Sequence, residues 1–312
     1  PGRAPDARAP PERPTPPRPE DRVDPTRRAA RRRRLGSRGA LVDSPPAPRP
    51  GRSDRRFRAL THPIESIAAV IAAMDSEVER CVECSDVGGY FAVVYRAVTE
   101  RVRDGIVAGE FADCERMERF DVLFARRYLD ARTNWRSGAA PVPESWRLAF
   151  ETAESGRCLV TQHLLLGINA HINLDLGVAA ASAAPAGEVE ALRDDFETIN
   201  DVLAELVDRM QASLATVSPW TRYVDIAGLR FDEALVNFSL RRARAEAWDF
   251  ATALSSASPD ERSRLEHQRD AEVVALGARI ARPGRPLRWL VGAARRRERH
   301  DLNGVITGLE PC

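Results

Sequence analysis

Residues 161–177 read TQHLLLGINAHINLDLG, and this stretch decides the fold class. At 100° per residue, apolar side chains cover almost every face of a helix built from it. A helix that is apolar all round belongs in the interior of a protein rather than on its surface. We therefore expect a central buried helix at about residues 157–181, followed by a break at Pro185 and Gly187.

The segments on either side of this helix have the apolar spacing of amphipathic helices. Their apolar residues recur at i, i+3, i+4 and i+7, and no segment shows the two-residue alternation of strands. Ser258 to Glu261 form a capping box with proline at the first helical position, which predicts a helix from Pro259 to Ile280. The other expected helices cover residues 64–74, 91–102, 117–129, 143–150, 189–210, 231–254 and 287–299, with a loop at 134–143. The sequence thus predicts an all-α fold, a single helical bundle of about eight to nine helices around the central helix.

The charge and composition of the chain divide it into three parts. All 47 basic residues are arginine, which excludes mechanisms that need a lysine Schiff base or a phosphate-loop lysine. Residues 1–58 hold 17 arginines, 7 acidic residues and 13 of the 22 prolines, so we expect a disordered Pro/Arg-rich tail. We expect the all-α domain at 61–300 and a flexible C-terminus at 301–312.

The basic tail raises the question of a nucleic-acid partner. The run Arg31 to Arg34 could bind phosphates by counterion release, but no aromatic side chains are interleaved for base stacking. A solvated tail is therefore the favoured interpretation over nucleic-acid binding. No apolar run reaches the roughly 18 to 20 residues of a membrane span. Five cysteines are too few for a disulfide scaffold, and Cys114, Cys158 and Cys312 are scattered, so we expect reduced thiols and a cytoplasmic protein. The oligomeric state is left open.

The central helix carries polar side chains where leucines would otherwise pack. Gln162, Asn169 and Asn173 fall on one stripe, and His171 and Asp175 fall on a second stripe. Buried amides cost a few kcal/mol each unless they are hydrogen-bonded, and a bare carboxylate costs more. Such groups persist when they satisfy one another or when they hold a ligand, a water molecule or a metal.

Two interpretations of the His171 and Asp175 pair stay open. The spacing of four residues suits a shared divalent metal, or a carboxylate that orients a histidine general base. Alternatively, Asp175 accepts a hydrogen bond from His171 within a structural network, while the asparagines tie neighbouring helix ends together. The first makes His171 and Asp175 catalytic residues or metal ligands, with Gln162, Asn169 and Asn173 as ligand-binding residues.

A metal would need a third ligand from another helix. Asp121, between Phe120 and Phe124, is the candidate that we add to the catalytic set, whereas we expect Asp195 to face solvent. His163 lies two turns before His171, so it could border the same cavity as a ligand-binding residue but could hardly share one ion.

Other motifs that carry chemistry are weak. Cys81 and Cys84 have redox or half-zinc spacing, but no second cysteine pair completes the ligands. The sequence contains no His-Glu-x-x-His, no Gly-x-Ser-x-Gly, no phosphate loop and no dinucleotide fingerprint.

The string GINAHINLDL at 167–176 resembles the signature of domain-of-unknown-function family 5995, a family common in actinobacteria. Further pieces resemble the family in the correct order, and the resemblance covers roughly residues 64–285. These pieces are 95–99, 111–113, 120–125, 142–146, 195–200 and 245–251. The sequence departs from the family by Phe120, where leucine is expected, and by His163 after Gln162. The resemblance implies no activity, but it singles out Asn169, His171, Asn173, Asp175 and Asp121.

The sequence therefore supports two hypotheses of function. One is a metal-dependent or His/Asp general-base enzyme, hydrolase-like, that acts on a small molecule. The other is a non-catalytic helical binding or scaffold protein, in which the same residues form a structural hydrogen-bond network. A divalent metal is the cofactor that the first hypothesis allows.

Overall fold

The protein is described here from a computed structural model, which covers residues 64–184, 188–199, 240–284, 291–296, 298 and 301–309. The predicted central helix is present as three continuous pieces. These are α6 (Val160–Ala170), a π-helical turn (His171–Asp175) and α7 (Leu176–Ala183). The expected tail at 1–58 and its boundary lie outside the described residues.

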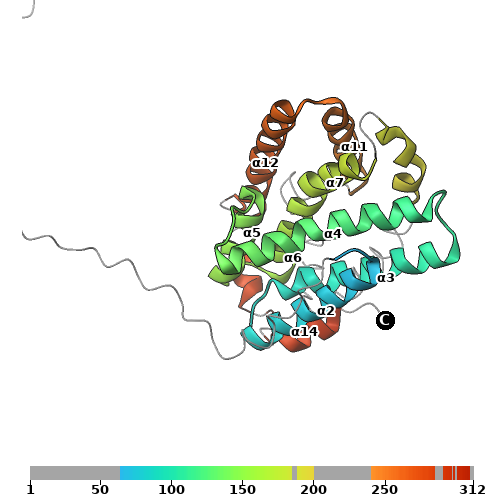
Figure 1. Cartoon of the computed structure of the whole chain (residues 1–312). Coiled ribbons are helices and arrows are strands. Elements are labelled where there is room, and N and C mark those ends of the chain that lie inside the picture. Colours follow the sequence, from blue (N-terminus) through green and yellow to red (C-terminus); the bar gives the residue numbers. More distant parts are fainter. Residues whose placement is uncertain are drawn as a thin grey trace, which may run out of the picture. The chain divides into compact units, whose positions relative to one another are not determined.

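The other described elements are also helices, so the all-α prediction is confirmed. No strand occurs within the described ranges. The surrounding elements are α2 (Ile67–Cys84), α3 (Gly89–Ala108), α4 (Cys114–Ser137), α5 (Glu144–Ser155), a 3-10 turn (Val189–Leu192), α11 (Leu240–Ser256), α12 (Pro259–Ala281) and α14 (Leu302–Leu309). Figure 1 shows α4 running across the bundle, with α2, α3 and α14 on one side of it and α7, α11 and α12 on the other.

Capping residues explain where the helices begin and end. Asp113 accepts a hydrogen bond from the Arg116 amide at the start of α4, and Ser258 accepts one from the Glu261 amide at the start of α12. Gly138 ends α4 with a φ of 65°, a left-handed conformation that glycine adopts without strain. Helix α4 therefore extends to Ser137, into the segment that we expected to be a loop from residue 134.

The central helix is enclosed because its neighbours contact different parts of it. α12, α5 and α3 pack against α6, while α11 and α4 pack against α7. Gly177 allows the close approach of α11, since a Cβ atom there would lie 2.8 Å from the Ala247 carbonyl oxygen and 2.6 Å from the Phe250 ring. The segment 160–183 is long and apolar enough to cross a membrane, but 89% of its most apolar window is buried inside the protein.

The C-terminal segment differs from our expectation of a flexible end at 301–312. Residues Leu302–Leu309 form α14, and Val305, Ile306 and Leu309 are buried against apolar residues of α3 such as Tyr90 and Val93. The apolar spacing within these eight residues creates a face that α3 can cover. This short helix was missed because the stretch contains only two turns.

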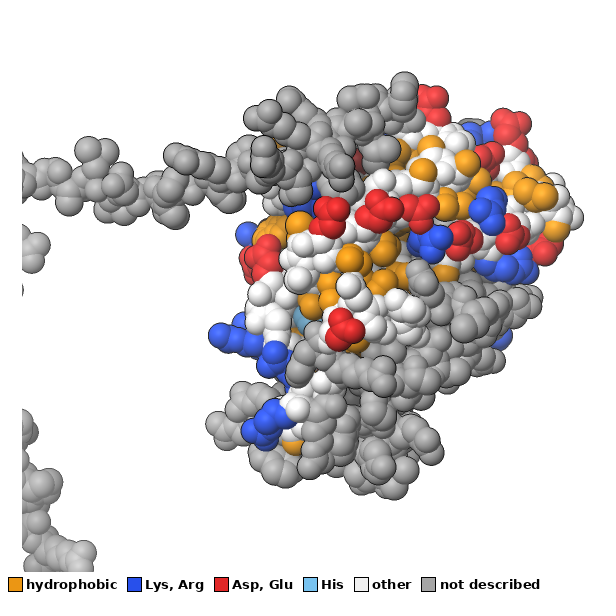
Figure 2. Space-filling view, turned by 90° about the horizontal axis from the view of Figure 1, so that it is seen from below, with side chains coloured by type: hydrophobic (Ala, Val, Ile, Leu, Met, Phe, Trp, Pro, Cys, Tyr) orange, Lys and Arg blue, Asp and Glu red, His pale blue; other side chains and the backbone are white. Residues whose placement is uncertain are grey.

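Figure 2 shows that, on the face it presents, acidic and arginine side chains alternate around groups of apolar ones. Among the described residues of this face, the basic side chains form no continuous patch.

We expect the substitution Gly177→Ala to lower the free energy of unfolding by about 2 kcal/mol, because the added methyl group would meet backbone that cannot move aside. The helix propensity of alanine offsets only about 1 kcal/mol of the overpacking. Urea denaturation of the variant measures the change. Gly284→Ala is the control, because a Cβ atom at Gly284 would enter open space, and equal stability of the two variants would contradict the close approach.

Candidate active site

His171 and Asp175 lie at the two ends of the π-helical turn. The turn is defined by the Leu176 amide, which donates to the His171 carbonyl five residues before it. Sequence periodicity predicted a regular helix here, so the π turn is a departure from the expected geometry. π turns place one extra residue in a helix and are frequent at functional sites.

The Asp175 carboxylate is buried and fully occupied by N–H donors. The Arg127 Nε donates to Oδ1 at 2.7 Å, and the Trp146 Nε1 donates to Oδ2 at 2.7 Å. His171 Nδ1 lies 3.3 Å from the same Oδ2 atom. Burial opposes ionisation of Asp175, but the Arg127 guanidinium and the hydrogen bonds outweigh it and lower the pKa of Asp175. This carboxylate therefore stays charged although its exposed fraction is 1%.

A charged Asp175 fixes the protonation of His171. Nδ1 must carry a proton to donate to the carboxylate, and burial lowers the pKa of His171, so the ring is neutral and Nε2 carries a lone pair. Nε2 is buried and has no hydrogen-bond partner among the described residues. An oriented imidazole with an unused lone pair is the arrangement of a general base.

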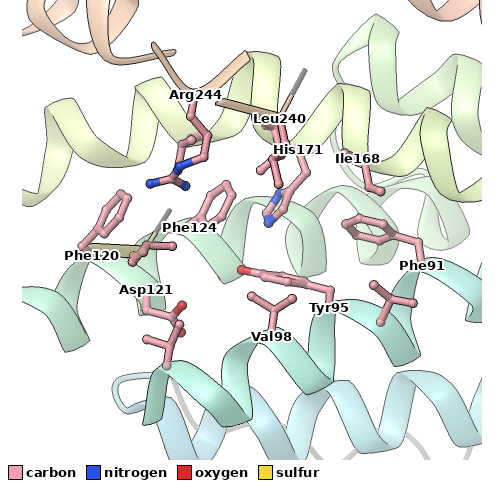
Figure 3. Close-up of a pocket in the computed structure, with 15 residues that line it drawn as sticks. Phe91, Tyr95, Val98, Phe120, Asp121, Phe124, Ile168, His171, Leu240 and Arg244 are labelled. Carbon is pink, nitrogen blue, oxygen red and sulfur yellow. The ribbon is translucent and has the colours of Figure 1, made fainter. Parts of the chain in front are cut away.

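Aromatic rings hold the imidazole in place. Phe124 stacks on it with the ring centroids 3.6 Å apart and the planes at 7°. The Tyr95 ring lies 4.3 Å away at a steep angle, and Figure 3 shows the imidazole above it. Packing on two sides limits the rotation of the His171 ring, and the contact with Asp175 fixes Nδ1 as the nitrogen that faces the carboxylate.

His171 borders an apolar pocket of about 110 Å³, which is lined by residues of α3, α4, the central helix and α11 together with Ile199. Its polar lining consists of His171, Tyr95, Asp121 and Arg244, and the remaining lining is apolar. Figure 3 shows the Tyr95 hydroxyl directed toward the side of the pocket where Asp121 lies, with the Arg244 guanidinium near Phe120. The Tyr95 hydroxyl and the Asp121 Oδ2 atom are buried without a hydrogen-bond partner in the described part of the chain. The structure thus brings two predicted residues, His171 and Asp121, to one cavity.

The environment of Asp121 differs from that of Asp175. Burial and the nearby Glu118 carboxylate raise the pKa of Asp121 to about 7. Asp121 is therefore a carboxyl group that is partly protonated near neutral pH, whereas Asp175 is ionised.

The three predicted amide residues form a structural network outside the pocket. Gln162 donates to the Ile280 carbonyl and Asn169 donates to the Val273 carbonyl, so both join the central helix to α12. Asn173 donates to the Asn169 side chain at 3.0 Å. The structure places this stripe against helix α12, which satisfies its amides without a ligand.

His163 and Asp195 also lie apart from His171. His163 borders a separate small cavity near Tyr90, where burial lowers its pKa to about 4. Asp195, which we expected to face solvent, has an exposed fraction of 1%. Its carboxylate accepts from the Ala112 and Asp113 amides and from Arg116, so it stabilises the start of α4.

The surroundings of Asp175 do not suit a metal ion shared with His171. No group of three His, Cys, Asp or Glu side chains in the described residues could hold an ion. Both Asp175 oxygens accept N–H bonds, and the Arg127 guanidinium would repel a divalent cation at this position. The geometry favours the carboxylate that orients a base over the His171 and Asp175 metal pair.

Sequence reasoning missed four residues that shape this site, namely Arg127, Trp146, Tyr95 and Arg244. Trp146 lay within the piece at 142–146 that resembles the family, and Arg127 resembles any charged residue on an amphipathic helix. Tyr95 lay within a stretch that resembles the family, which was the one available signal for it. Nothing in the sequence distinguished Arg244 from the other arginines of its segment.

We expect the substitution Asp121→Asn to stabilise the protein increasingly as the pH rises. In the unfolded chain this carboxyl ionises near pH 3.8 and in the folded protein near pH 7, so the wild type loses stability between these values. Between pH 5 and pH 8, the difference in favour of Asp121→Asn should grow by about 2 to 3 kcal/mol. Urea denaturation of both proteins at the two pH values measures it, and a difference that stays constant would contradict a buried Asp121 with a raised pKa.

Comparison with known proteins identifies the family of the chain and assigns no reaction. Residues 67–283 match a family model described as a family of unknown function, domain-of-unknown-function family 5995. The matched range agrees with the resemblance expected over about residues 64–285. No curated protein and no solved structure matches the chain. The match spans the whole helical body from α2 to the end of α12, and the chain therefore belongs to domain-of-unknown-function family 5995.

Proposed function

We propose that this protein is a hydrolase-like enzyme that acts on a small, largely apolar molecule, with His171 as general base. The observation that supports the proposal is the lone pair on His171 Nε2, which is buried, unpartnered within the described residues and adjacent to a pocket. Buried polar groups in folded proteins usually have hydrogen-bond partners, so an unpartnered nitrogen beside a pocket is the position where a ligand or a water molecule could bind.

In the proposed mechanism, a water molecule in the pocket donates a hydrogen bond to His171 Nε2. As the water attacks a carbonyl carbon of the substrate, its proton passes to Nε2 and the imidazole becomes imidazolium. The Asp175 carboxylate stabilises this cation through the Nδ1–H bond and is not itself protonated, because Arg127 and Trp146 keep it ionised. The proton on Nε2 then passes to the leaving group, which restores the neutral base.

Tyr95 has a supporting role in this proposal. Its hydroxyl has no partner among the described residues and lies in the lining beside His171. A hydroxyl in a low-dielectric pocket can donate to the negative oxygen that develops during carbonyl attack.

The size of the pocket limits the substrate. A dry engineered cavity of about 150 Å³ accommodates benzene, and this pocket measures about 110 Å³. A substrate with an acyl group of a few carbon atoms fits this volume, whereas a polymer does not.

The alternative hypothesis, a structural network in a binding or scaffold protein, accounts for one of the two polar stripes. Gln162, Asn169 and Asn173 are satisfied by one another and by α12. His171 is not satisfied in this way, because only one of its two nitrogens has a partner among the described residues. This difference between the stripes favours a function at His171.

Hydrolysis of methyl acetate by the full chain, followed by the acid that is released, tests the proposal. We expect His171→Gln and Asp175→Asn to reduce the enzymatic rate by about 100-fold or more, the contribution typical of general acid–base catalysis. His163→Gln is the matched control, since this second buried histidine borders a different cavity and should retain the activity.

The wild type is assayed with and without a chelator, because a metal-dependent reaction would be slower when the chelator is present. Equal rates in the His171→Gln and His163→Gln proteins, with both folded by circular dichroism, would rule out His171 as the base.

A further inference from the structure

The Asp121 side of the pocket contains a carboxyl group that the proposed mechanism does not use. Asp121 has an exposed fraction of 4%, and its Oδ2 atom has no hydrogen-bond partner in the described residues. It lines the same cavity as Tyr95 and His171, and Figure 3 shows these side chains around one space. A buried carboxyl group without a partner is costly, so the pocket gains free energy from any ligand that satisfies it.

The hydrogen-bonding capacity of this part of the pocket is dominated by acceptors. His171 Nε2 can only accept, because Nδ1 carries the proton that bonds Asp175. An ionised Asp121 also only accepts, and the Tyr95 hydroxyl can accept as well as donate. A ligand group that carries several N–H donors complements such a set better than a carbonyl or a carboxylate does.

The apolar lining next to Asp121 also favours a cationic group. Phe120 and Phe124 flank Asp121 on α4, with parallel rings whose centroids are 6.1 Å apart. Tyr95 completes this aromatic surrounding at 5.8 Å from Phe124. Aromatic rings attract ammonium groups through the negative charge of their faces.

Arg244 is the one positive charge in the described lining, and its position matters for a cationic ligand. Its guanidinium donates to the Phe196 carbonyl at 2.5 Å and lies over the Phe196 ring at 4.3 Å. These contacts hold the guanidinium toward Phe196 rather than toward His171.

We propose that the pocket binds a small molecule with a primary amine, whose ammonium group pairs with the Asp121 carboxylate while its short apolar chain lies against Phe120, Phe124 and Ile172. If the amine is the substrate of the enzyme, this inference rests on the proposed function, because it names the substrate class for the same pocket. The binding itself depends on Asp121 and not on the base.

Three probes with the same branched chain test the charge preference, namely isopentylamine, isopentanol and 3-methylbutanoate. At neutral pH they are a cation, a neutral donor and acceptor, and an anion. Isothermal titration calorimetry with the full chain should give at least tenfold tighter binding of isopentylamine than of the other two. Equal binding of the amine and the alcohol would overturn the proposal, and so would tighter binding of 3-methylbutanoate, which would place the preference at Arg244.

Two matched variants test whether the ammonium group pairs with Asp121. Asp121→Asn should weaken isopentylamine binding at least tenfold and leave isopentanol binding within about twofold. Glu118→Gln also neutralises a carboxylate on α4, but Glu118 does not line the pocket and accepts from the Ile67 amide instead. It should retain amine binding, and an equal loss in both variants would overturn a direct pairing with Asp121.

A second substitution guards against a folding defect. Asp121→Leu removes the charge with an apolar side chain that suits the lining, and it should lose the amine preference as Asp121→Asn does. Ester hydrolysis without amine binding would overturn the amine inference alone. Amine binding without His171-dependent hydrolysis would support it and overturn the proposed reaction.

Discussion

The organisation of this protein depends on one buried carboxylate. Asp175 has three N–H donors, from Arg127 on α4, Trp146 on α5 and His171 in its own helix. Removing a charge from water costs several kcal/mol, and close donors offset this cost only when their geometry is well defined. The carboxylate therefore joins the central helix to two neighbouring helices and at the same time sets the protonation of His171. The stability of the fold and the proton affinity of His171 therefore both depend on the Asp175 carboxylate oxygens.

The two polar stripes of the central helix resemble each other in sequence but differ in what completes them. The amide stripe donates hydrogen bonds to backbone carbonyl groups of α12. The central helix can approach α12 this closely because Gly277 has no side chain. The His171 stripe meets aromatic rings, which supply packing but few hydrogen bonds. The amide stripe therefore holds the central helix to α12, whereas the His171 stripe keeps a buried nitrogen without a hydrogen-bond partner among the described residues.

Much of the fold could be predicted, because apolar periodicity and capping residues act locally. The helix at Pro259–Ala281 follows from its capping box, and the burial of 161–177 follows from its composition. The site could be predicted only in part. His171, Asp175 and Asp121 could be identified because they are polar residues within apolar stretches of sequence. Their partners could not be identified, because these are brought close by the packing of distant segments. Arg127 and Trp146 lie 48 and 29 residues from Asp175, and no local pattern records that separation. The burial of Asp195 was missed for the same reason, since its partners are more than 75 positions away.

The π turn has a consequence for how this helix tolerates changes of length. It accommodates one residue more than an α-helix of the same rise, so the residues after it keep the orientation that a shorter, regular α-helix would give them. Deleting a single position between His171 and Asp175 would restore ordinary i to i+4 bonding and leave the residues downstream in nearly the same orientation. Gly177 would still face Ala247 and Phe250, so the close contact between α7 and α11 would persist. The surplus residue is therefore a local feature of the turn from His171 to Asp175, and the helix contact beyond the turn does not depend on it.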